Sequence, residues 1–129
     1  MEFPSGLLYT KDHEWAQPGS DDVVTIGITE HAQDALGELV YVELPQIGRD
    51  LKAHDTFGVV ESIKAVSDLY SPVAGKVLET NGQVSSDPSI INRSSYNEGW
   101  LIRLKLTDKG SLKGLMSADE YRNYVATLK

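Results

Sequence analysis

One lysine stands out among the residues that could do chemistry. Lys64 lies near the middle of the segment Gly58 to Tyr70, between two apolar, β-branched runs of the kind that form strands. We therefore expect a β-hairpin that presents Lys64 in solvent at its tip. Its neighbours Ile63 and Ala65 are apolar, which favours an amine free of salt bridges. This setting suits the attachment point of a prosthetic group, although composition alone does not separate Lys64 from an ordinary solvated lysine.

The other reactive side chains form no catalytic pattern. His13, His31 and His54 lack the spacing of a zinc-binding helix, so we interpret them as surface or structural histidines and expect no metal site. No serine lies in a nucleophile elbow, and no carboxylate pair is singled out by its spacing. The chain has no cysteine, so any sulfur chemistry must come from an attached group. The sequence therefore predicts a protein that is not an enzyme by its own side chains.

Length and charge set the class of the protein. The 129 residues fit a single domain, 1–129, with a hydrophobic core of its own. The formal net charge of −7 argues against nucleic acid or anionic membrane as the main partner and is compatible with partners that carry basic patches. No apolar run approaches a membrane span and no signal-peptide pattern is present. We expect a monomeric cytoplasmic protein.

The elements that must position Lys64 are predicted to be mostly β-strands. Strand-like runs cover residues 6–16 with a polar turn between two strands, and then 23–28, 38–44 and 100–106. Residues 84–88 are predicted to be a loop. Many short strands with little helix indicate a sandwich or a barrel.

Two helices are predicted outside the strands. Thr29 and Gly37 have the types expected before and after a short helix from Glu30 to Leu36, which should bury Ala32, Ala35 and Leu36. The Ser117 to Glu120 segment is a capping box, and Met116 and Tyr121 are placed for a hydrophobic staple. This predicts a helix over 118–128 that packs on the β core.

A weak internal repeat flanks the lysine segment. Pro45, Gly48 and Leu51 recur as Pro72, Gly75 and Leu78, each at an offset of 27 residues. Two such turns suggest two related β-halves folded against each other, with the lysine between them. The alternative is that proline and glycine are simply common in turns.

The segment Glu61-Ser62-Ile63-Lys64-Ala65 closely resembles the lipoylation motif of the glycine cleavage system H-protein family. Further blocks match the family in the same order along the chain: 13–15, 27–33, 36–37, 42–45, 71–75, 99–100 and Tyr121. The resemblance implies a barrel-sandwich hybrid fold, with a short helix near 29–36, a C-terminal helix near 118–128, and lipoate in amide linkage to Lys64. Glu61, Gly75 and Gly48 match positions associated with recognition by the lipoylating enzyme, although turn geometry explains the two glycines equally well.

The resemblance also implies a shuttle mechanism. The lipoyl disulfide accepts an aminomethyl group from glycine at the pyridoxal-phosphate-dependent P-protein and presents it to the tetrahydrofolate-dependent T-protein. The L-protein, dihydrolipoamide dehydrogenase, then reoxidises the dithiol, with NAD as the final acceptor. A lipoate ligase or a lipoyl/octanoyl transferase would load Lys64. Thiol–disulfide exchange suits this cycle, and a chain without cysteine offers no competing thiol.

The loaded arm carries a cationic amine that a carboxylate could hold. The family's arm-binding cleft maps onto Glu14 first, then Asp68, and last Asp12, which stands where some members have serine. The alternative for each is an ordinary solvated acid on an acidic protein.

Three rival interpretations can be weighed against the sequence. Lipoyl or biotinyl domains of other complexes carry Asp-Lys-Ala or Met-Lys-Met around the lysine and lack the C-terminal helix, and neither feature matches here. A relay of lipoate to 2-oxoacid dehydrogenase subunits fits the sequence as well as glycine cleavage does. An independent enzyme that uses Glu14 and His13 would be active without lipoate.

Overall fold

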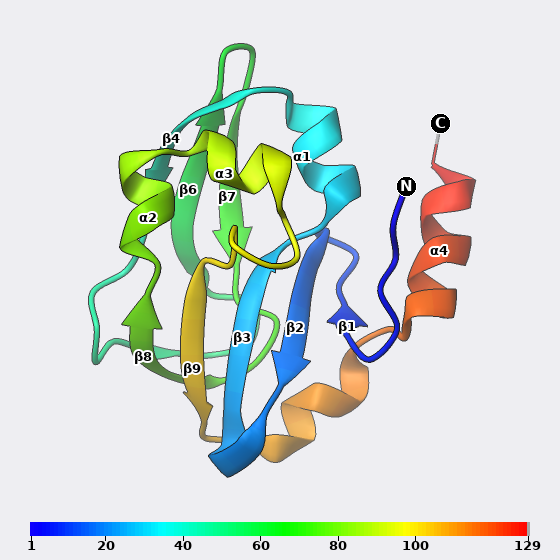
Figure 1. Cartoon of the computed structure of the whole chain (residues 1–129). Helices are drawn as coiled ribbons and strands as arrows, with labels where there is room; N and C mark the ends of the chain where they lie inside the picture. Colours follow the sequence, from blue (N-terminus) through cyan, green and yellow to red (C-terminus); the bar gives the residue numbers. More distant parts are fainter. Residues whose placement is uncertain (129) are drawn as a thin grey trace.

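Two antiparallel β-sheets face each other across the core of the protein (Figure 1). The computed structural model describes residues 1–128. The larger sheet has the strand order β1–β2–β3–β9–β8–β5, formed by Leu8–Tyr9, Glu14–Pro18, Val23–Ile28, Ile102–Leu106, Gly75–Thr80 and Asp50–Leu51. The smaller sheet has the order β4–β6–β7, formed by Leu39–Glu43, Thr56–Ser62 and Val66–Tyr70. The mostly β prediction is confirmed.

Both predicted helices form with the predicted caps. Helix α1 spans Glu30–Leu36, where the Thr29 hydroxyl accepts a hydrogen bond from the Ala32 N–H at 3.2 Å and the chain leaves through Gly37. Helix α4 spans Ala118–Thr127 and begins with a complete capping box between Ser117 and Glu120.

Two details of the helix predictions are wrong. Ala35 is exposed, and only Ala32 and Leu36 of α1 pack against the core. Residues 84–86 are not loop but belong to helix α2, Gly82–Ser86, which is followed by α3, Ser89–Arg93. Two 3₁₀ turns, Ser20–Asp22 and Lys109–Gly114, complete the elements, and no helix within residues 1–128 is long and apolar enough to cross a bilayer.

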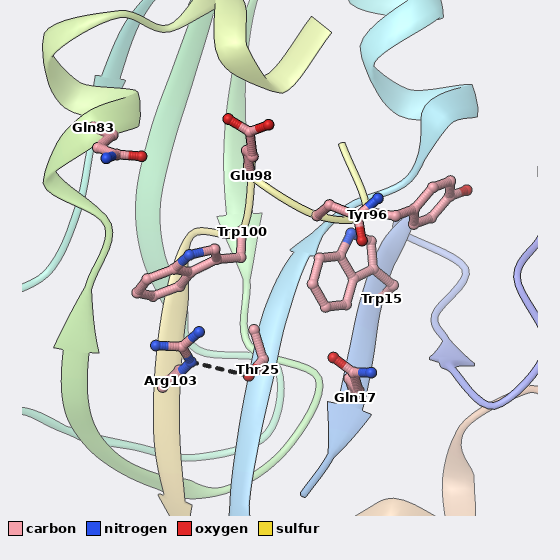
Figure 2. A pocket seen from close by; sticks show the side chains of 9 residues that line it. Trp15, Gln17, Thr25, Gln83, Tyr96, Glu98, Trp100 and Arg103 are labelled. Carbon is pink, nitrogen blue, oxygen red and sulfur yellow. Dashed lines mark hydrogen bonds between the residues drawn. The ribbon is translucent and has the colours of Figure 1, made fainter. Parts of the chain in front are cut away.

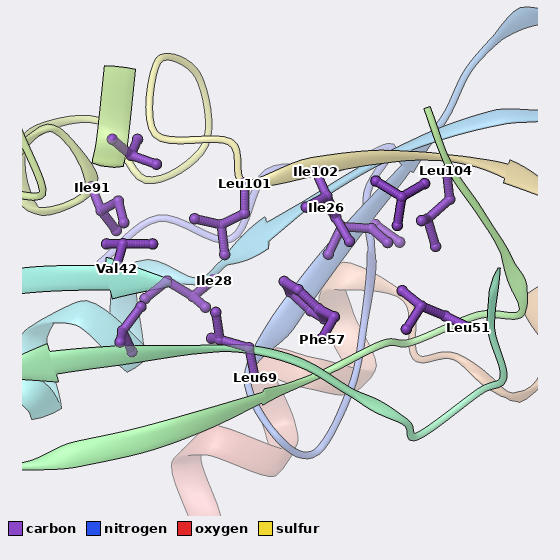
Figure 3. Close-up of a cluster of buried hydrophobic side chains, with 14 of the residues drawn as sticks. Ile26, Ile28, Val42, Leu51, Phe57, Leu69, Ile91, Leu101, Ile102 and Leu104 are labelled. Carbon is purple, nitrogen blue, oxygen red and sulfur yellow. The ribbon is translucent and has the colours of Figure 1, made fainter. Parts of the chain in front are cut away.

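The core fills the space between the sheets and continues under the short helices. Figure 3 shows part of this cluster of buried aliphatic and aromatic side chains, among them Ile26, Phe57, Leu69, Ile91 and Leu101. A second, aromatic cluster seats the C-terminal helix, because the Tyr9 and Tyr121 rings stack at a centroid distance of 4.7 Å. Burial of these side chains from both sheets makes the scaffold rigid below the hairpin.

The two repeated turns lie against each other. Asp50 pairs with Lys76, and the Gly48 N–H donates to the Val77 carbonyl at 2.8 Å. They meet at the start of β8, whereas the β6–β7 hairpin protrudes at the opposite end of the molecule (Figure 1). The two turns therefore fold together as expected, but the expectation that they place the lysine between them is wrong.

Candidate functional site

The tip of the β6–β7 hairpin is held by the side chain of Ser62. Its buried hydroxyl accepts hydrogen bonds from the N–H groups of Lys64 at 3.3 Å and Ala65 at 3.0 Å. The Ser62 N–H donates to the Ala65 carbonyl at 2.8 Å. Because one side chain satisfies several backbone groups of a three-residue tip, the base of the Lys64 side chain is fixed in place.

The tip is also anchored to the chain that follows α1. The Ile63 N–H donates to the Glu38 carbonyl at 3.3 Å. The side chain of Lys64 runs beside Gly37, since a Cβ atom on Gly37 would lie 3.5 Å from the lysine Cε. Gly37 has a φ of +85°, a conformation that residues with a side chain rarely adopt, so glycine suits the end of the helix. A Cβ atom there would make only ordinary van der Waals contact with Lys64.

The Lys64 amine fits the requirements of an attachment site. The residue is exposed, and among residues 1–128 its side chain makes no ion pair. Its neighbours Ile63 and Val66 are 76% and 67% exposed, so an apolar surface surrounds the amine. An acyl chain linked to this nitrogen would start from a rigid, accessible base.

Two of the predicted acidic residues lie on the outer face of the smaller sheet. Glu61 pairs with Tyr41 on one side and Val66 on the other, and it is half-buried in this row. Asp68 pairs with Val59 and is exposed. A protein that approaches Lys64 along this face would meet both carboxylates.

Glu14 has a different environment, because its side chain is only 2% exposed. Its carboxylate accepts hydrogen bonds from the Thr10 hydroxyl at 2.8 Å and from the Tyr70 N–H at 3.4 Å. Burial raises the pKa of Glu14 to about 7, and the charge of Asp12 adds to the rise. Glu14 and Asp12 are therefore close, whereas no side-chain hydrogen bond within residues 1–128 joins either of them to Asp68.

The histidines of the same region are parts of the scaffold. His13 Nδ1 lies 2.8 Å from the Tyr121 hydroxyl, which in turn lies 2.8 Å from the Thr29 hydroxyl. The rings of His13 and His31 are 4.6 Å apart, and the pKa of His13 is lowered by burial and by His31. This chain of contacts connects the β1–β2 turn, α1 and α4.

Gly75 is the first residue of β8 and Gly48 bonds to Val77 of the same strand, and this start of β8 lies at the end of the molecule opposite the β6–β7 hairpin (Figure 1). Gly75 is buried, and a Cβ atom there would lie 2.7 Å from the Lys105 carbonyl oxygen. Gly48 has a φ of +94° in an exposed turn. Backbone packing and turn conformation are sufficient reasons for both glycines.

Two hollows in the surface could also hold a ligand. The one in Figure 2, about 410 Å³, lies on the larger sheet and contains none of the predicted site residues. Its cation is already engaged, because Arg103 stacks over Trp100 at 4.0 Å, donates to Thr25 and pairs with Glu79 at 2.7 Å.

The other hollow was missed by sequence reasoning. This α1–α3 groove, about 420 Å³, is lined by Gln33, Asp34, Gly37, Glu38, Ser89, Asn92 and Arg93. No local pattern marks it, because α3 has only five residues and was not predicted.

Comparison with known proteins agrees with this geometry. The glycine cleavage H-protein family model matches residues 7–128. The glycine cleavage system H protein of Alcanivorax borkumensis is 50% identical over 121 residues, 94% of each chain. That of Thermoanaerobacter sp. is 49% identical over 125 residues, 97% of this chain and 98% of the relative. The crystal structure of a glycine cleavage system H protein from Mycobacterium marinum superposes with a TM-score of 0.88 at 39% identity, covering 95% of this chain and 98% of that one.

The family model covers nearly the whole chain, including the hairpin with its lysine, both capped helices and all nine strands within residues 1–128. The chain belongs to the glycine cleavage H-protein family, and it is a non-catalytic lipoyl carrier of the glycine cleavage system.

Proposed function

We propose that residues 1–129 act as one lipoyl-carrier domain and that lipoate is attached in amide linkage to Lys64. The observation that carries this proposal is the exposed amine, which makes no ion pair within residues 1–128, on a hairpin tip that Ser62 holds rigid. When attached, lipoate supplies a disulfide that can accept a one-carbon unit and a dithiol that can be reoxidised by exchange. The P-protein, the T-protein and dihydrolipoamide dehydrogenase are the successive partners of such a carrier.

The protein's own residues contribute position and recognition. Ser62 and the Glu38 carbonyl fix the tip, so that an arm on Lys64 sweeps from a defined point. Glu61 is accessible on the outer face, three residues before the lysine, where a lipoate ligase or transferase would contact it. Gly48 and Gly75 would affect such an enzyme only through the shape of their distant turns.

The acidic residues have unequal access to a cationic amine on the arm. Asp68 is exposed and can pair with a cation directly. Asp12 is exposed in the β1–β2 turn, close to Glu14. Glu14 is sealed by its contacts with Thr10 and Tyr70, so it would reach the amine only after β7 moves away. A cytoplasmic location is also part of this proposal, in keeping with the bacterial relatives.

Intact-mass measurement after expression in cells with working lipoylation tests the attachment site. We expect a lipoyl-sized mass increase localised to the peptide that contains Lys64, and no increase in Lys64→Arg. Lys76→Arg, at another exposed lysine, is the matched control and should be modified normally. An unmodified wild-type chain, or a lipoyl group that persists in Lys64→Arg, would overturn the assignment.

Reconstitution of glycine decarboxylation from purified proteins tests whether the chain is a carrier or an enzyme in its own right. Glycine decarboxylation with purified P-, T- and L-proteins should require the lipoylated chain, and the unlipoylated chain should be inactive alone. Activity of the unlipoylated chain by itself would favour an independent enzyme that uses Glu14 and His13.

A further inference from the structure

The hollow around Trp100 and Arg103, the Trp100 hollow, is built on the larger sheet (Figure 2). Its floor is a row of paired residues that crosses three strands: Gln17 of β2, Thr25 of β3 and Arg103 of β9. Trp15 forms the back wall and lies flat on Gly27, since a Cβ atom on Gly27 would lie 2.6 Å from Cζ2 of the indole. Paired strands and a buried ring make this surface rigid before a ligand binds.

The loop above this floor is also fixed in place. The Asn81 side-chain amide donates to the carbonyls of Glu98 at 2.9 Å and of Trp100 at 2.8 Å. The Trp15 Nε1–H donates to the Ser95 carbonyl at 2.9 Å. Asn81 and Trp15 are both buried, which strengthens these hydrogen bonds. The side chains of Glu98 and Trp100 therefore project from a well-anchored backbone.

One charge of the Trp100 hollow is left to pair with a ligand. Arg103 stacks over Trp100 at 4.0 Å and pairs with Glu79 at 2.7 Å, so its positive charge is already neutralised. Within residues 1–128, the exposed Glu98 carboxylate makes no ion pair and accepts no hydrogen bond. The group that the hollow can pair with is therefore a cation.

The uncharged groups fit a peptide backbone with an apolar side chain. The side-chain amides of Gln17, Gln83 and Asn97 form no hydrogen bond within residues 1–128, and each offers a donor and an acceptor. Trp100 and Tyr96 are half-buried, so part of each ring remains for apolar contact. Tryptophan, tyrosine and arginine are also the residues that contribute most binding energy at protein interfaces.

The Trp100 hollow is separate from the surroundings of Lys64. None of its lining residues belongs to the β6–β7 hairpin, and none hydrogen-bonds to the hairpin tip within residues 1–128. The hollow lies on strands of the larger sheet, whereas the tip protrudes from the smaller sheet at one end of the molecule (Figure 1). A segment bound in the hollow therefore leaves the lysine uncovered.

We propose that the Trp100 hollow is a second docking site, which binds a short peptide segment of a partner protein with a lysine or arginine beside an apolar residue. The basic side chain pairs with Glu98, and the apolar side chain packs on the ring of Trp100. The volume of about 410 Å³ lies in the range of small-ligand sites, so it suits a short segment and not a folded surface. This inference does not depend on the attachment of lipoate.

Such a site would act as a tether. A partner that holds the chain through the Trp100 hollow keeps the hairpin at a high effective concentration near its own active site. The tip remains free to enter that site, because the two surfaces do not overlap. Affinity gained at the hollow thus adds to the affinity of the tip without restricting it.

Titration of the ¹⁵N-labelled full chain with the peptide acetyl-Gly-Lys-Leu-Gly-amide tests the docking site. We expect saturable chemical-shift changes at the Trp100 indole N–H and at the side-chain amides of Gln17 and Asn97. The backbone amides of residues 63–65 should not change. The peptide acetyl-Gly-Glu-Leu-Gly-amide, of opposite charge, should bind about tenfold more weakly.

Substitution of the unpaired acid separates local pairing from net charge. Glu98→Gln keeps the shape of an exposed side chain and removes its charge, so the dissociation constant of the lysine peptide should rise about tenfold. Glu43→Gln, at an exposed acid on the smaller sheet, changes the net charge equally and is the matched control. It should bind the lysine peptide like the wild type.

Four results would overturn the docking site. Equal affinity for the two peptides, or an equal loss in Glu98→Gln and Glu43→Gln, would show attraction by net charge alone. Shift changes confined to the hairpin would place the peptide elsewhere. No saturable change up to about 10 mM peptide would show that the hollow binds no such segment. Changes at the hollow with maltose and none with the peptide would assign it to an uncharged polyol.

Discussion

At the scale of the residue, Glu14 is the most constrained of the acidic side chains near the site. It is nearly fully buried, and it connects the β1–β2 turn to β7 through Thr10 and Tyr70. Both of its protein partners are donors, but two hydrogen bonds do not replace the lost hydration of a carboxylate. The protonated acid is therefore favoured in the fold, and the negative charge is available only at a cost in stability.

The stability of the protein should consequently depend on pH through Glu14. The folded state holds this proton up to a pKa of about 7, whereas the unfolded chain releases it near 4.5. The unfolded state thus binds fewer protons between these values, so the free energy of unfolding falls as pH rises from about 4.5 to 7, by roughly 3 kcal/mol. Glu14→Gln should remove this contribution, as measured by urea unfolding across the pH range.

The control for Glu14→Gln is the same substitution at a carboxylate that is not buried. Glu43→Gln, on the exposed outer face of β4, should keep the slope of the wild type. Parallel stability curves for wild type and Glu14→Gln would show that Glu14 is ionised in the fold at no cost.

At the scale of the element, the hairpin and the helices show what local sequence determines. Thr29, Gly37 and the Ser117 capping box act within one turn of chain, so the predicted bounds of α1 and the predicted start of α4 are correct, and α4 ends at Thr127, one residue before the predicted end. Helices α2 and α3 were missed because five-residue helices have almost no periodicity and are stabilised by burial of Val84 and Ile91.

Long-range packing decides the features of the site that sequence could not supply. Nothing local distinguishes the buried Glu14 from the exposed Asp12, because burial depends on where β7 lies. The spacing of Gly75 eleven residues after Lys64 likewise does not predict the distance between them in space. Strand β7 lies between the two residues and leads the chain away from the hairpin tip. The motif therefore identifies the attachment lysine, and the tertiary fold sorts the residues around it.

The order of the hairpin tip should depend on a single hydroxyl. Ser62→Ala leaves the N–H groups of Lys64 and Ala65 without their acceptor, so amide hydrogen exchange at Ala65 should accelerate about tenfold, equivalent to about 1.4 kcal/mol. Ser67→Ala is the control, because the Ser67 hydroxyl donates to the Asp68 carbonyl and bonds to no group of the tip, and it should leave exchange at Ala65 unchanged. Equal exchange in Ser62→Ala and wild type would mean that the strands alone hold the tip.

At the scale of the whole molecule, charge and shape work together. The net charge of −7 is carried by a compact β scaffold whose hairpin protrudes at one end (Figure 1). Glu38, Glu61 and Asp68 surround the exposed apolar side chains of Ile63 and Val66. Such a surface suits partners that present basic groups around an apolar entrance. Opposite charges accelerate association of the two proteins, and apolar contact then stabilises the complex.

Association with the P-protein should therefore be sensitive to salt. Raising the ionic strength from 0.1 to 1 M shortens the screening length from about 10 Å to about 3 Å. The association rate constant measured by stopped flow should fall roughly tenfold, while the dissociation rate constant changes much less. An association rate that does not respond to salt would mean that apolar contact alone guides the encounter.

The hydrogen bond from the Tyr70 N–H to Glu14 has a further consequence for how the hairpin behaves in a crowded cell. Strands β4 and β7 are the edges of the three-stranded sheet, and an exposed edge can add a strand from another chain. At the β7 edge the Tyr70 N–H is taken by a buried carboxylate and Asp68 adds a charge nearby, while β4 is bent by an irregular register between Leu39 and Tyr41 in its pairing with β6. A hairpin that has to protrude to offer its lysine can thus do so without acting as a template for aggregation.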